Sequence, residues 1–404
     1  MSSINIALLG FGTVGKGVFE IIQTHQEKLQ FFLGKPVKIV AVLVNDLAKH
    51  TLQDSEILLT NRFEEVIQIN ELDVVIDAIV GTEPGYTYVK RAIERGCHVI
   101  TANKEMFAHH GQELLSLAED HHVSVGFEAT VGGGIPVIQT LRKLLKVNTV
   151  TKIEGIINGT SNFILTNMRE DGLSFDETLA IAQAKGYAEA DPTNDIEGFD
   201  AYFKALVLSN VVFGSLPEKD NIVRKGITNI TQEQIQQAVS FGLKFKHVVK
   251  LEKLAGRIQC KIQPILVSVS HPFYSIEGVQ NAVSIHADIV GNISLIGPGA
   301  GKFPTASAVI EDLLHLYQEQ IPPYFSNESE STDQQEEMGQ WLIFKHQGQL
   351  ILPQTLDKVE HLSEQVLYVR GKEVDLKTFE NEHPDVNVYP IEGVVQFSKE
   401  LVLS

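Results

Sequence analysis

Cysteine and cationic residues are scarce in this chain, and each scarcity excludes a class of protein. Among 404 residues only Cys97 and Cys260 are cysteines, and no CxxC spacing occurs. The sequence therefore predicts neither a disulfide framework nor a zinc site. Lysine and arginine number 33 against 51 acidic residues, which gives a net charge of −18. That charge argues against non-specific binding to nucleic acids or anionic membranes.

Long apolar runs are also missing. The first residues, MSSINIALLGFG, lack the basic segment and apolar core of a signal peptide, and no stretch is long enough to span a bilayer. We therefore expect a cytoplasmic protein. Hydrophobic residues still make up 43% of the chain, which is ample for a globular core, and the length predicts two or three domains.

The first 130 residues alternate short apolar strands with helical segments, the pattern of a parallel α/β sheet. Strands are expected at residues 4–9, 37–44, 72–80, 98–102 and 123–129. This region, residues 1–130, is predicted to be a Rossmann dinucleotide-binding domain, to which an amphipathic helix at 304–320 also belongs.

From residue 131 onward the pattern is mixed, and we expect a second α+β domain over residues 131–303. Strands are predicted at residues 152–158, 258–269 and 281–288. Helices are predicted around residues 175–186, 196–213 and 232–243. The acidic stretch 325–339 reads as a linker. Residues 340–404 then form a small strand-rich domain.

A glycine-rich motif, GFGTVG, directly follows the first strand and opens a helix, the context that the dinucleotide fingerprint requires. Gly10 makes the tight turn, Gly12 lets the backbone approach a pyrophosphate, and Gly15 allows the helix to pack on its strand. The helix N-terminus then faces the anion. The motif predicts a dinucleotide cofactor.

The choice between NAD and NADP stays open. An acidic residue at the end of the second strand favours NAD, and a basic residue there accommodates the 2′-phosphate of NADP. Here Asn45 and Asp46 are followed by Lys49 and His50, so both cofactors fit the pattern.

Two lysines stand where hydride-transfer chemistry would need them. Lys104 follows the end of a predicted strand, the edge at which open α/β sheets bind ligands. Asp200 and Lys204 are four residues apart on a predicted helix, the spacing of an ordinary surface ion pair worth ~0.3–0.5 kcal/mol. Large apolar residues flank this pair, however, and such surroundings make a lysine tunable for acid–base work.

Taken in order, these motifs resemble the homoserine dehydrogenase family. They are GFGTVG at 10–15, TANKEMFA at 101–108, FEATVGGGIPVI at 127–138, GIINGTSNFIL at 155–165, GYAEADPTNDIEGFDAYFK at 186–204 and GPGAGKFPTASAV at 297–309. The resemblance covers residues 1 to about 320. It implies reversible, NAD(P)H-dependent reduction of L-aspartate 4-semialdehyde to L-homoserine, on the pathway to threonine, methionine and isoleucine.

The resemblance also implies roles for the residues of the substrate site. Lys204 would be the general acid, and Asp200 would orient it or help to bind the substrate. Glu189 would hold the substrate's ammonium group, and Lys104 would lie between nicotinamide and substrate. Backbone at Asn158, Gly159 and Thr160 would line the substrate pocket.

For the cofactor, the resemblance implies contacts from Thr13 and Val14 of the glycine motif and from Gly301. It also points to Asn45, where many relatives carry an arginine whose absence weakens the case for a strong NADP preference.

A monovalent cation, usually sodium, is implied on the loop that contains Glu128, Val131, Gly133 and Ile135. A tight turn linking two domains would explain the same glycines equally well. The family further implies a homodimer formed through the sheet of the second domain. Longer bacterial members end in an ACT domain, and residues 340–404 fit a divergent, ACT-like module slightly better than an unrelated tail.

Two other functions share part of this pattern. An aspartate semialdehyde dehydrogenase needs a nucleophilic cysteine, whereas Cys97 and Cys260 both look like small buried residues. A non-catalytic dinucleotide-binding regulator would need the glycine motif but not Glu189, Asp200 and Lys204.

Overall fold

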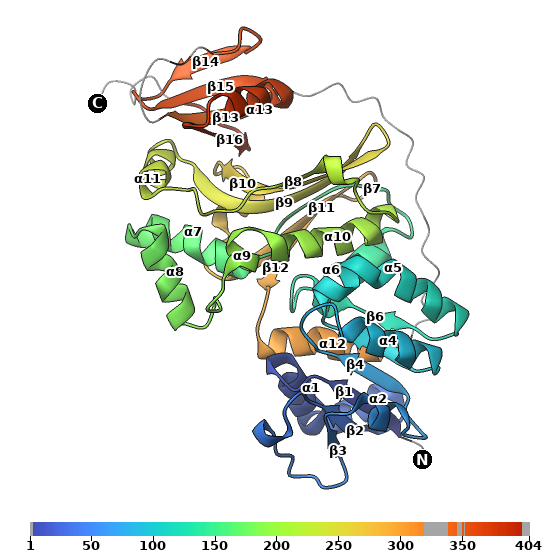
Figure 1. Cartoon of the computed structure of the whole chain (residues 1–404). Coiled ribbons are helices and arrows are strands. Elements are labelled where there is room, and N and C mark those ends of the chain that lie inside the picture. The colour runs from blue at the N-terminus through green and yellow to red at the C-terminus, as the bar shows by residue number, and fades with distance from the viewer. Residues whose placement is uncertain (1–2, 319–337, 346–349, 351, 398–404) are drawn as a thin grey trace. The chain divides into compact units, whose positions relative to one another are not determined.

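A computed structural model describes residues 3–318, 338–345, 350 and 352–397, which divide into two compact units (Figure 1). Among these residues, unit 1 comprises 3–150, 203–216 and 286–318, and unit 2 comprises 151–202, 217–285 and those from 338 onward. Most of the predicted linker at 325–339 lies outside the described residues. The finer division at residues 131 and 340 stays a prediction.

Unit 1 is built on a parallel sheet with the strand order β3-β2-β1-β4-β5-β6. This is the strand order of the dinucleotide-binding Rossmann fold, so the predicted fold of this region is confirmed. The strands are β1 Ile4–Leu9, β2 Val37–Leu43, β3 Leu58–Thr60, β4 Val74–Asp77, β5 His98–Thr101 and β6 Val125–Gly126.

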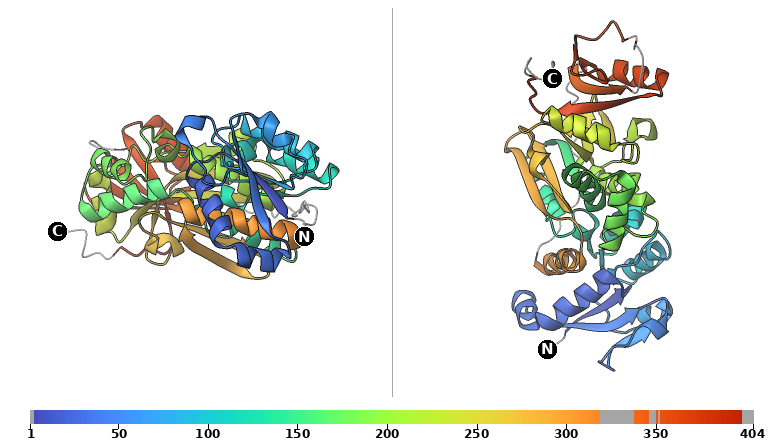
Figure 2. Two further views of the ribbon diagram at one scale, coloured as in Figure 1. Left: turned by 90° about the horizontal axis from the view of Figure 1, so that it is seen from below. Right: turned by 90° about the vertical axis from the view of Figure 1, so that its left-hand side faces the viewer.

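Helices cover this sheet, and one of them comes from far along the chain. Helix α12 packs against α1 through a shared apolar core that includes Val18, Ala306 and Val309 (Figures 1 and 2). The packing is close, since a Cβ added at Gly17 would lie 2.7 Å from the carbonyl oxygen of Lys302. The helices of unit 1 are α1 Thr13–Thr24, α2 Gln26–Leu33, α3 Phe63–Ile67, α4 Gly85–Glu94, α5 Lys104–Asp120, α6 Val137–Leu144 and α12 Lys302–Gln318; β12 Gly291–Pro298 also belongs to unit 1.

Unit 2 contains a mixed sheet with helices against it. Its strands follow the order β11-β7-β9-β10-β16-β13-β15-β14, and β8 also pairs with β10. The elements before the C-terminal segment are β7 Val150–Ile156, α7 Gly159–Asp171, α8 Phe175–Ala184, α9 Thr193–Ile196, α10 Phe199–Phe213, β8 Ile222–Arg224, α11 Gln232–Ser240, β9 Lys244–Leu254, β10 Arg257–Val267 and β11 Gln280–Ala287. Helix α10 begins in unit 2 and continues into unit 1.

Several predicted elements differ from the structure for local reasons. The single helix expected at 196–213 is broken at Gly198, whose φ is +78°, and α10 starts at the next residue. The strand expected at 72–80 stops at Asp77, because its carboxylate accepts a hydrogen bond from the Ile79 amide. The strand expected at 123–129 covers only Val125–Gly126. Strand β9 and helix α7 were not predicted.

The C-terminal segment is a small antiparallel sheet with one helix among its described residues. Its strand order, β16-β13-β15-β14, places the last and third strands beside the first, as in a βαββαβ module. Its elements are β13 Met338–Lys345, β14 Lys358–His361, β15 Val366–Lys372, α13 Glu373–Glu382 and β16 Val386–Glu392. Strand β16 pairs with β10 of the larger sheet. ACT-like character remains a prediction.

A charged cluster inside unit 2 accounts for two of the lysines of β9. The Glu277 carboxylate accepts hydrogen bonds from Lys244 (2.6 Å) and Lys246 (3.0 Å) of β9 and from Arg169 (3.0 Å) of α7. Burial opposes the charge on Glu277, but the hydrogen bond from Lys244 and the charge of Lys246 hold its pKa at about 2. Lys246 is 1% exposed, so its ammonium group depends on this carboxylate.

No helix among the described residues is both long and apolar enough to cross a membrane. Both cysteines, Cys97 and Cys260, are buried free thiols.

We expect Glu277→Gln to lower the free energy of unfolding by about 2 kcal/mol at pH 7, because three cations lose their carboxylate. The pKa of Glu277 is depressed in the folded protein, so its stabilising effect is present above about pH 4.5 and is lost as the pH falls towards 2. Urea unfolding of both proteins at pH 7, 5 and 3 would measure this convergence.

Glu170→Gln is the matched control for that substitution, since Glu170 also pairs with Arg169 but its side chain is 57% exposed. It should change stability by less than about 0.5 kcal/mol. An equal loss in both variants, or a difference from wild type that does not depend on pH, would contradict the role assigned to Glu277.

Candidate active site

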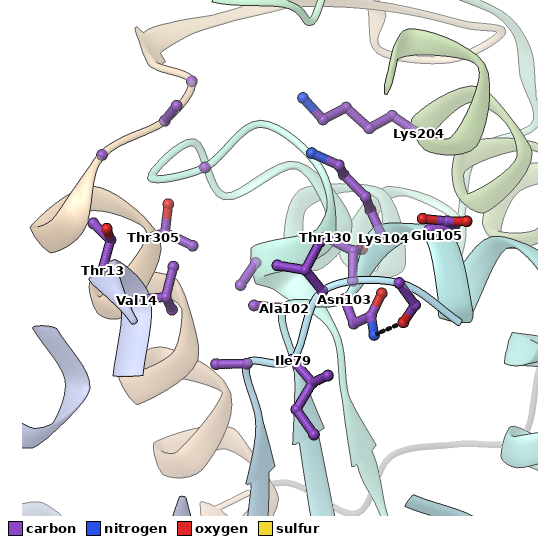
Figure 3. Close-up of a pocket in the computed structure, with 18 residues that line it drawn as sticks. Thr13, Val14, Ile79, Ala102, Asn103, Lys104, Glu105, Thr130, Lys204 and Thr305 are labelled. Carbon is purple, nitrogen blue, oxygen red and sulfur yellow. Dashed lines mark hydrogen bonds between the residues drawn. The ribbon is translucent and has the colours of Figure 1, made fainter. Parts of the chain in front are cut away.

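A cavity of about 320 Å³ lies in unit 1, beyond the carboxyl ends of β1, β4 and β5 (Figure 3). Ligands of open α/β sheets bind at this edge. All of its lining residues belong to unit 1: Thr13, Val14, Ala78, Ile79, Val80, Gly81, Ala102, Asn103, Lys104, Glu105, Ala129, Thr130, Gly133, Lys204, Gly299, Ala300, Gly301 and Thr305.

Positive charge converges on this cavity. The helices α1, α5 and α12 each begin among its lining residues, and a helix N-terminus carries a partial positive charge. Lys104 and Lys204 also line the cavity, and both side chains point into it in Figure 3. The chain as a whole is strongly acidic. The electrostatics of the cavity therefore favour an anionic group, such as a phosphate or a carboxylate.

The glycine motif has the conformation that a pyrophosphate site requires. Gly10 has a φ of +95°, and a Cβ there would lie 2.7 Å from the Ala78 carbonyl oxygen. A Cβ at Gly15 would lie 2.1 Å from the carbonyl oxygen of Gly10. Gly12 differs from both, because an added Cβ would meet nothing within 4 Å. The space in front of Gly12 is thus open, as the close approach of a pyrophosphate to the backbone requires.

Lys204 is not the surface lysine that its local spacing alone would predict. Lys204 is only 8% exposed, and Asp200, one turn earlier on α10, is 3% exposed. Lys104 is the first residue of α5 and lies three residues after the end of β5, near the strand end as the sequence predicted. The structure thus brings Lys104 and Lys204 to the same cavity, together with Thr13, Val14 and Gly301.

The remaining predicted substrate residues lie in unit 2. The side chain of Asn158 caps α7 and donates hydrogen bonds to Asp200 (2.9 Å) and Asp195 (2.7 Å). Thr160 donates to the carbonyl of Tyr187 (2.6 Å). The structure therefore joins Asn158 to Asp200. Gly159 is the first residue of α7, and Glu189 is exposed on the segment after α8.

The loop predicted to hold a cation is buried, and its glycines have unusual backbone angles. Gly132 and Gly133 have φ values of +75° and +58°. Both carboxylate oxygens of Glu128 accept backbone hydrogen bonds, from Ile138 and Gln139 at the start of α6. Burial and the neighbouring Asp312 raise the pKa of Glu128 to about 8.

Among the described residues, no group of three or more His, Cys, Asp and Glu side chains is arranged to hold a metal. Val131 and Ile135, the other two predicted ligands, are buried on the same loop.

Asn45 lies at the end of β2, exposed and outside the cavity described above. Next to it, the Asp46 carboxylate accepts the Ala48 amide (3.0 Å) and pairs with Lys49 (3.4 Å). Acid and base neutralise each other at this strand end, so its charge does not decide between NAD and NADP.

Asp77 and Asn103 were not identified from the sequence. Asp77 is fully buried at the end of β4, and this burial raises its pKa to about 6. Asn103 caps α5 and lines the cavity. Both residues lie at or just after the end of a strand, and this position, which identified Lys104, could have identified them as lining residues too. Thr305 also lines the cavity, but it does not follow a strand end, so the sequence does not point to it.

We expect Gly12→Ala to fold with unchanged stability and to bind NAD(P)H at least about tenfold more weakly, because the methyl group enters only the space of the ligand. Thermal unfolding and fluorescence titration with NADH and NADPH would measure the two effects separately.

Gly34→Ala should show the opposite pattern. Gly34 has a φ of +70° and open surroundings at the end of α2, so alanine there costs about 1 kcal/mol of stability and leaves the dinucleotide affinity unchanged. Normal dinucleotide binding by Gly12→Ala would show that the ligand does not approach this loop.

Two family models together match most of the chain. The model of homoserine dehydrogenase matches residues 136–314, and the model of the homoserine dehydrogenase NAD binding domain matches residues 10–128. The homoserine dehydrogenase of Bacillus subtilis is 41% identical over 315 residues, which is 78% of this chain and 73% of that protein. The homoserine dehydrogenase of Lactococcus lactis is 38% identical over 317 residues, 78% of this chain and 74% of that protein.

Solved structures give the same assignment over a longer range. A homoserine dehydrogenase from Thiobacillus denitrificans has a TM-score of 0.86 at 30% identity and covers 97% of this chain and 99% of its own. A hyperthermophilic archaeal homoserine dehydrogenase in complex with NADPH has a TM-score of 0.67 at 30% identity, covering 78% of this chain and 98% of its own. The chain therefore belongs to the homoserine dehydrogenase family of NAD(P)-dependent oxidoreductases.

Proposed function

We propose that this protein reduces L-aspartate 4-semialdehyde to L-homoserine reversibly, with Lys204 as the general acid, in the biosynthesis of threonine, methionine and isoleucine. The observation that carries the proposal is the cavity of unit 1, where Lys104 and Lys204 point into the space beyond the glycine motif. NADH or NADPH would be held there by Gly10, Gly12, Thr13, Val14, Gly15 and Gly301.

Bound NAD(P)H supplies the hydride that reaches the aldehyde carbon. Lys204 donates a proton to the aldehyde oxygen as the new C–H bond forms, so the product is a neutral alcohol and the lysine becomes a neutral amine. It recovers its proton from solvent before the next turnover. In the reverse direction, the neutral amine of Lys204 accepts the hydroxyl proton of homoserine.

Lys104 supplies the second ammonium group of the cavity. At the start of α5 it would lie between nicotinamide and substrate, where its charge attracts the developing negative charge on the aldehyde oxygen. Glu105, the next residue of α5, also lines the cavity.

We assign the amino-acid end of the substrate to further residues by their match to the family motifs. Glu189 would pair with the α-ammonium group. Backbone at Asn158, Gly159 and Thr160 would line the pocket. Asp200 would orient Lys204 one turn further along α10, and the hydrogen bond from Asn158 holds Asp200 in place.

We further propose that sodium, or another monovalent cation, binds to backbone carbonyl groups of Glu128, Val131, Gly133 and Ile135. The left-handed angles of Gly132 and Gly133 support this, since they redirect successive peptide groups. A homodimer formed through the sheet of the second domain and a cytoplasmic location are proposed on the family resemblance.

Lys204→Ala should lower kcat for homoserine oxidation by at least about 10²-fold, because the proton then has no positioned acceptor. The dissociation constant for NAD(P)H should stay within about threefold of the wild type, since the glycine motif is unchanged. Homoserine-dependent reduction of NAD⁺ and of NADP⁺, with a fluorescence titration of each reduced cofactor, would measure both quantities and the cofactor preference.

Lys143→Ala provides the control, because Lys143 is an exposed lysine of α6 that does not line the cavity. It should retain wild-type kinetics. A wild-type protein that binds the dinucleotide but does not turn over homoserine would instead support a non-catalytic dinucleotide-binding regulator.

The cation proposal predicts saturable activation. Turnover and the melting temperature should both rise when sodium chloride replaces choline chloride at constant ionic strength, because an ion that binds only the folded protein stabilises it. Equal values in the two salts would argue against a cation site on this loop.

A further inference from the structure

A buried carboxylate links two loops of the cavity. Asp77 ends β4 and is fully buried; its carboxylate accepts hydrogen bonds from the Ile79 amide (3.0 Å) and the Thr101 hydroxyl (2.8 Å). Thr101 ends the neighbouring strand β5, and its hydroxyl oxygen accepts the Asn103 amide (3.0 Å). The chain segments that leave two adjacent strands are thus tied to one another at the point where they enter the cavity.

Asn103 extends this connection with its own side chain. Its amide oxygen accepts the Met106 amide (3.1 Å) and so caps α5, whose first residue is Lys104. Its amide nitrogen donates to the Gly81 carbonyl (2.8 Å), the bond drawn in Figure 3. One side chain therefore fixes the start of the lysine-bearing helix and the end of the loop that follows β4.

The loop of residues 78–81 depends on this support. All of it lines the cavity, yet the Val80 side chain is 92% exposed and anchors nothing. On the other side, Gly85 begins α4 so close to the network that a Cβ there would lie 2.9 Å from the amide nitrogen of Asn103. The network has no space to shift towards α4, and its geometry is fixed on that side.

We propose that Asp77, Thr101 and Asn103 are positioning residues for the reaction: they hold the loop of residues 78–81 against the bound dinucleotide and set the direction in which Lys104 enters the cavity. The kinetic part of this inference rests on the proposed function. The binding part does not, because it concerns the dinucleotide alone.

Asn103→Ser separates the two bonds of Asn103. Serine is as good a helix cap as asparagine, but its hydroxyl is too short to reach the Gly81 carbonyl. We expect this variant to melt within a few degrees of the wild type. Its dissociation constant for NADH or NADPH, measured by fluorescence without homoserine, should rise about tenfold, the effect of one lost hydrogen bond to a charged or buried group. The KM for the dinucleotide should rise with it.

Thr101 offers a second, independent pair of variants. Thr101→Ser keeps the hydroxyl and both of its hydrogen bonds, and should bind the dinucleotide as the wild type does. Thr101→Val keeps the shape but loses both bonds, and should show weaker dinucleotide binding and a lower kcat, because Lys104 also loses its orientation.

Wild-type dinucleotide affinity and kcat in Asn103→Ser and Thr101→Val, with only a lower melting temperature, would overturn the inference and leave the network a structural role. A failure of the proposed function gives a different result. In that case the wild type does not oxidise homoserine, whereas the difference in dinucleotide affinity between Thr101→Ser and Thr101→Val is still present.

Discussion

A parallel sheet sends the carboxyl ends of all its strands to one edge, and the site of this protein depends on that constraint. The turns after β1, β4 and β5 meet there, and helices α1 and α5, which follow β1 and β5, have their N-termini at the same cavity. Helix α12 adds another N-terminus from a distant part of the chain. A strongly acidic protein thereby gains a locally positive cavity before any lysine is counted.

Two lysine side chains, Lys104 and Lys204, also line this cavity. Lys104 takes its place from the strand end and from the Asn103 cap, so the backbone that leaves β5 for the cavity also positions this side chain. Lys204 lies on α10, and Asp200 lies in the first turn of the same helix. The helix starts at Phe199, directly after Gly198, which has a left-handed backbone conformation. The two lysines that line the cavity thus come from segments that lie far apart in the sequence.

Local sequence identified the features that depend on neighbours along the chain. The GFGTVG turn, the strand-end lysine and the buried character of the Lys204 helix follow from spacing and apolar flanks. Contacts between segments that lie far apart in the chain cannot be recognised from local sequence patterns. Lys244 and Lys246 of β9 look like residues of a solvated surface until Glu277 is placed beside them, and nothing in the sequence around Asp77 shows that its carboxylate accepts a hydrogen bond from Thr101. The strand order of the C-terminal segment is likewise a property of long-range pairing.

The pH dependence of homoserine oxidation tests the central claim most directly. If Lys204 accepts the hydroxyl proton, kcat of the wild type rises with pH until one group has lost its proton, and Lys204→Ala loses this rise while the dinucleotide still binds. A rise that persists unchanged in Lys204→Ala would contradict the account, because the proton acceptor would then be another group.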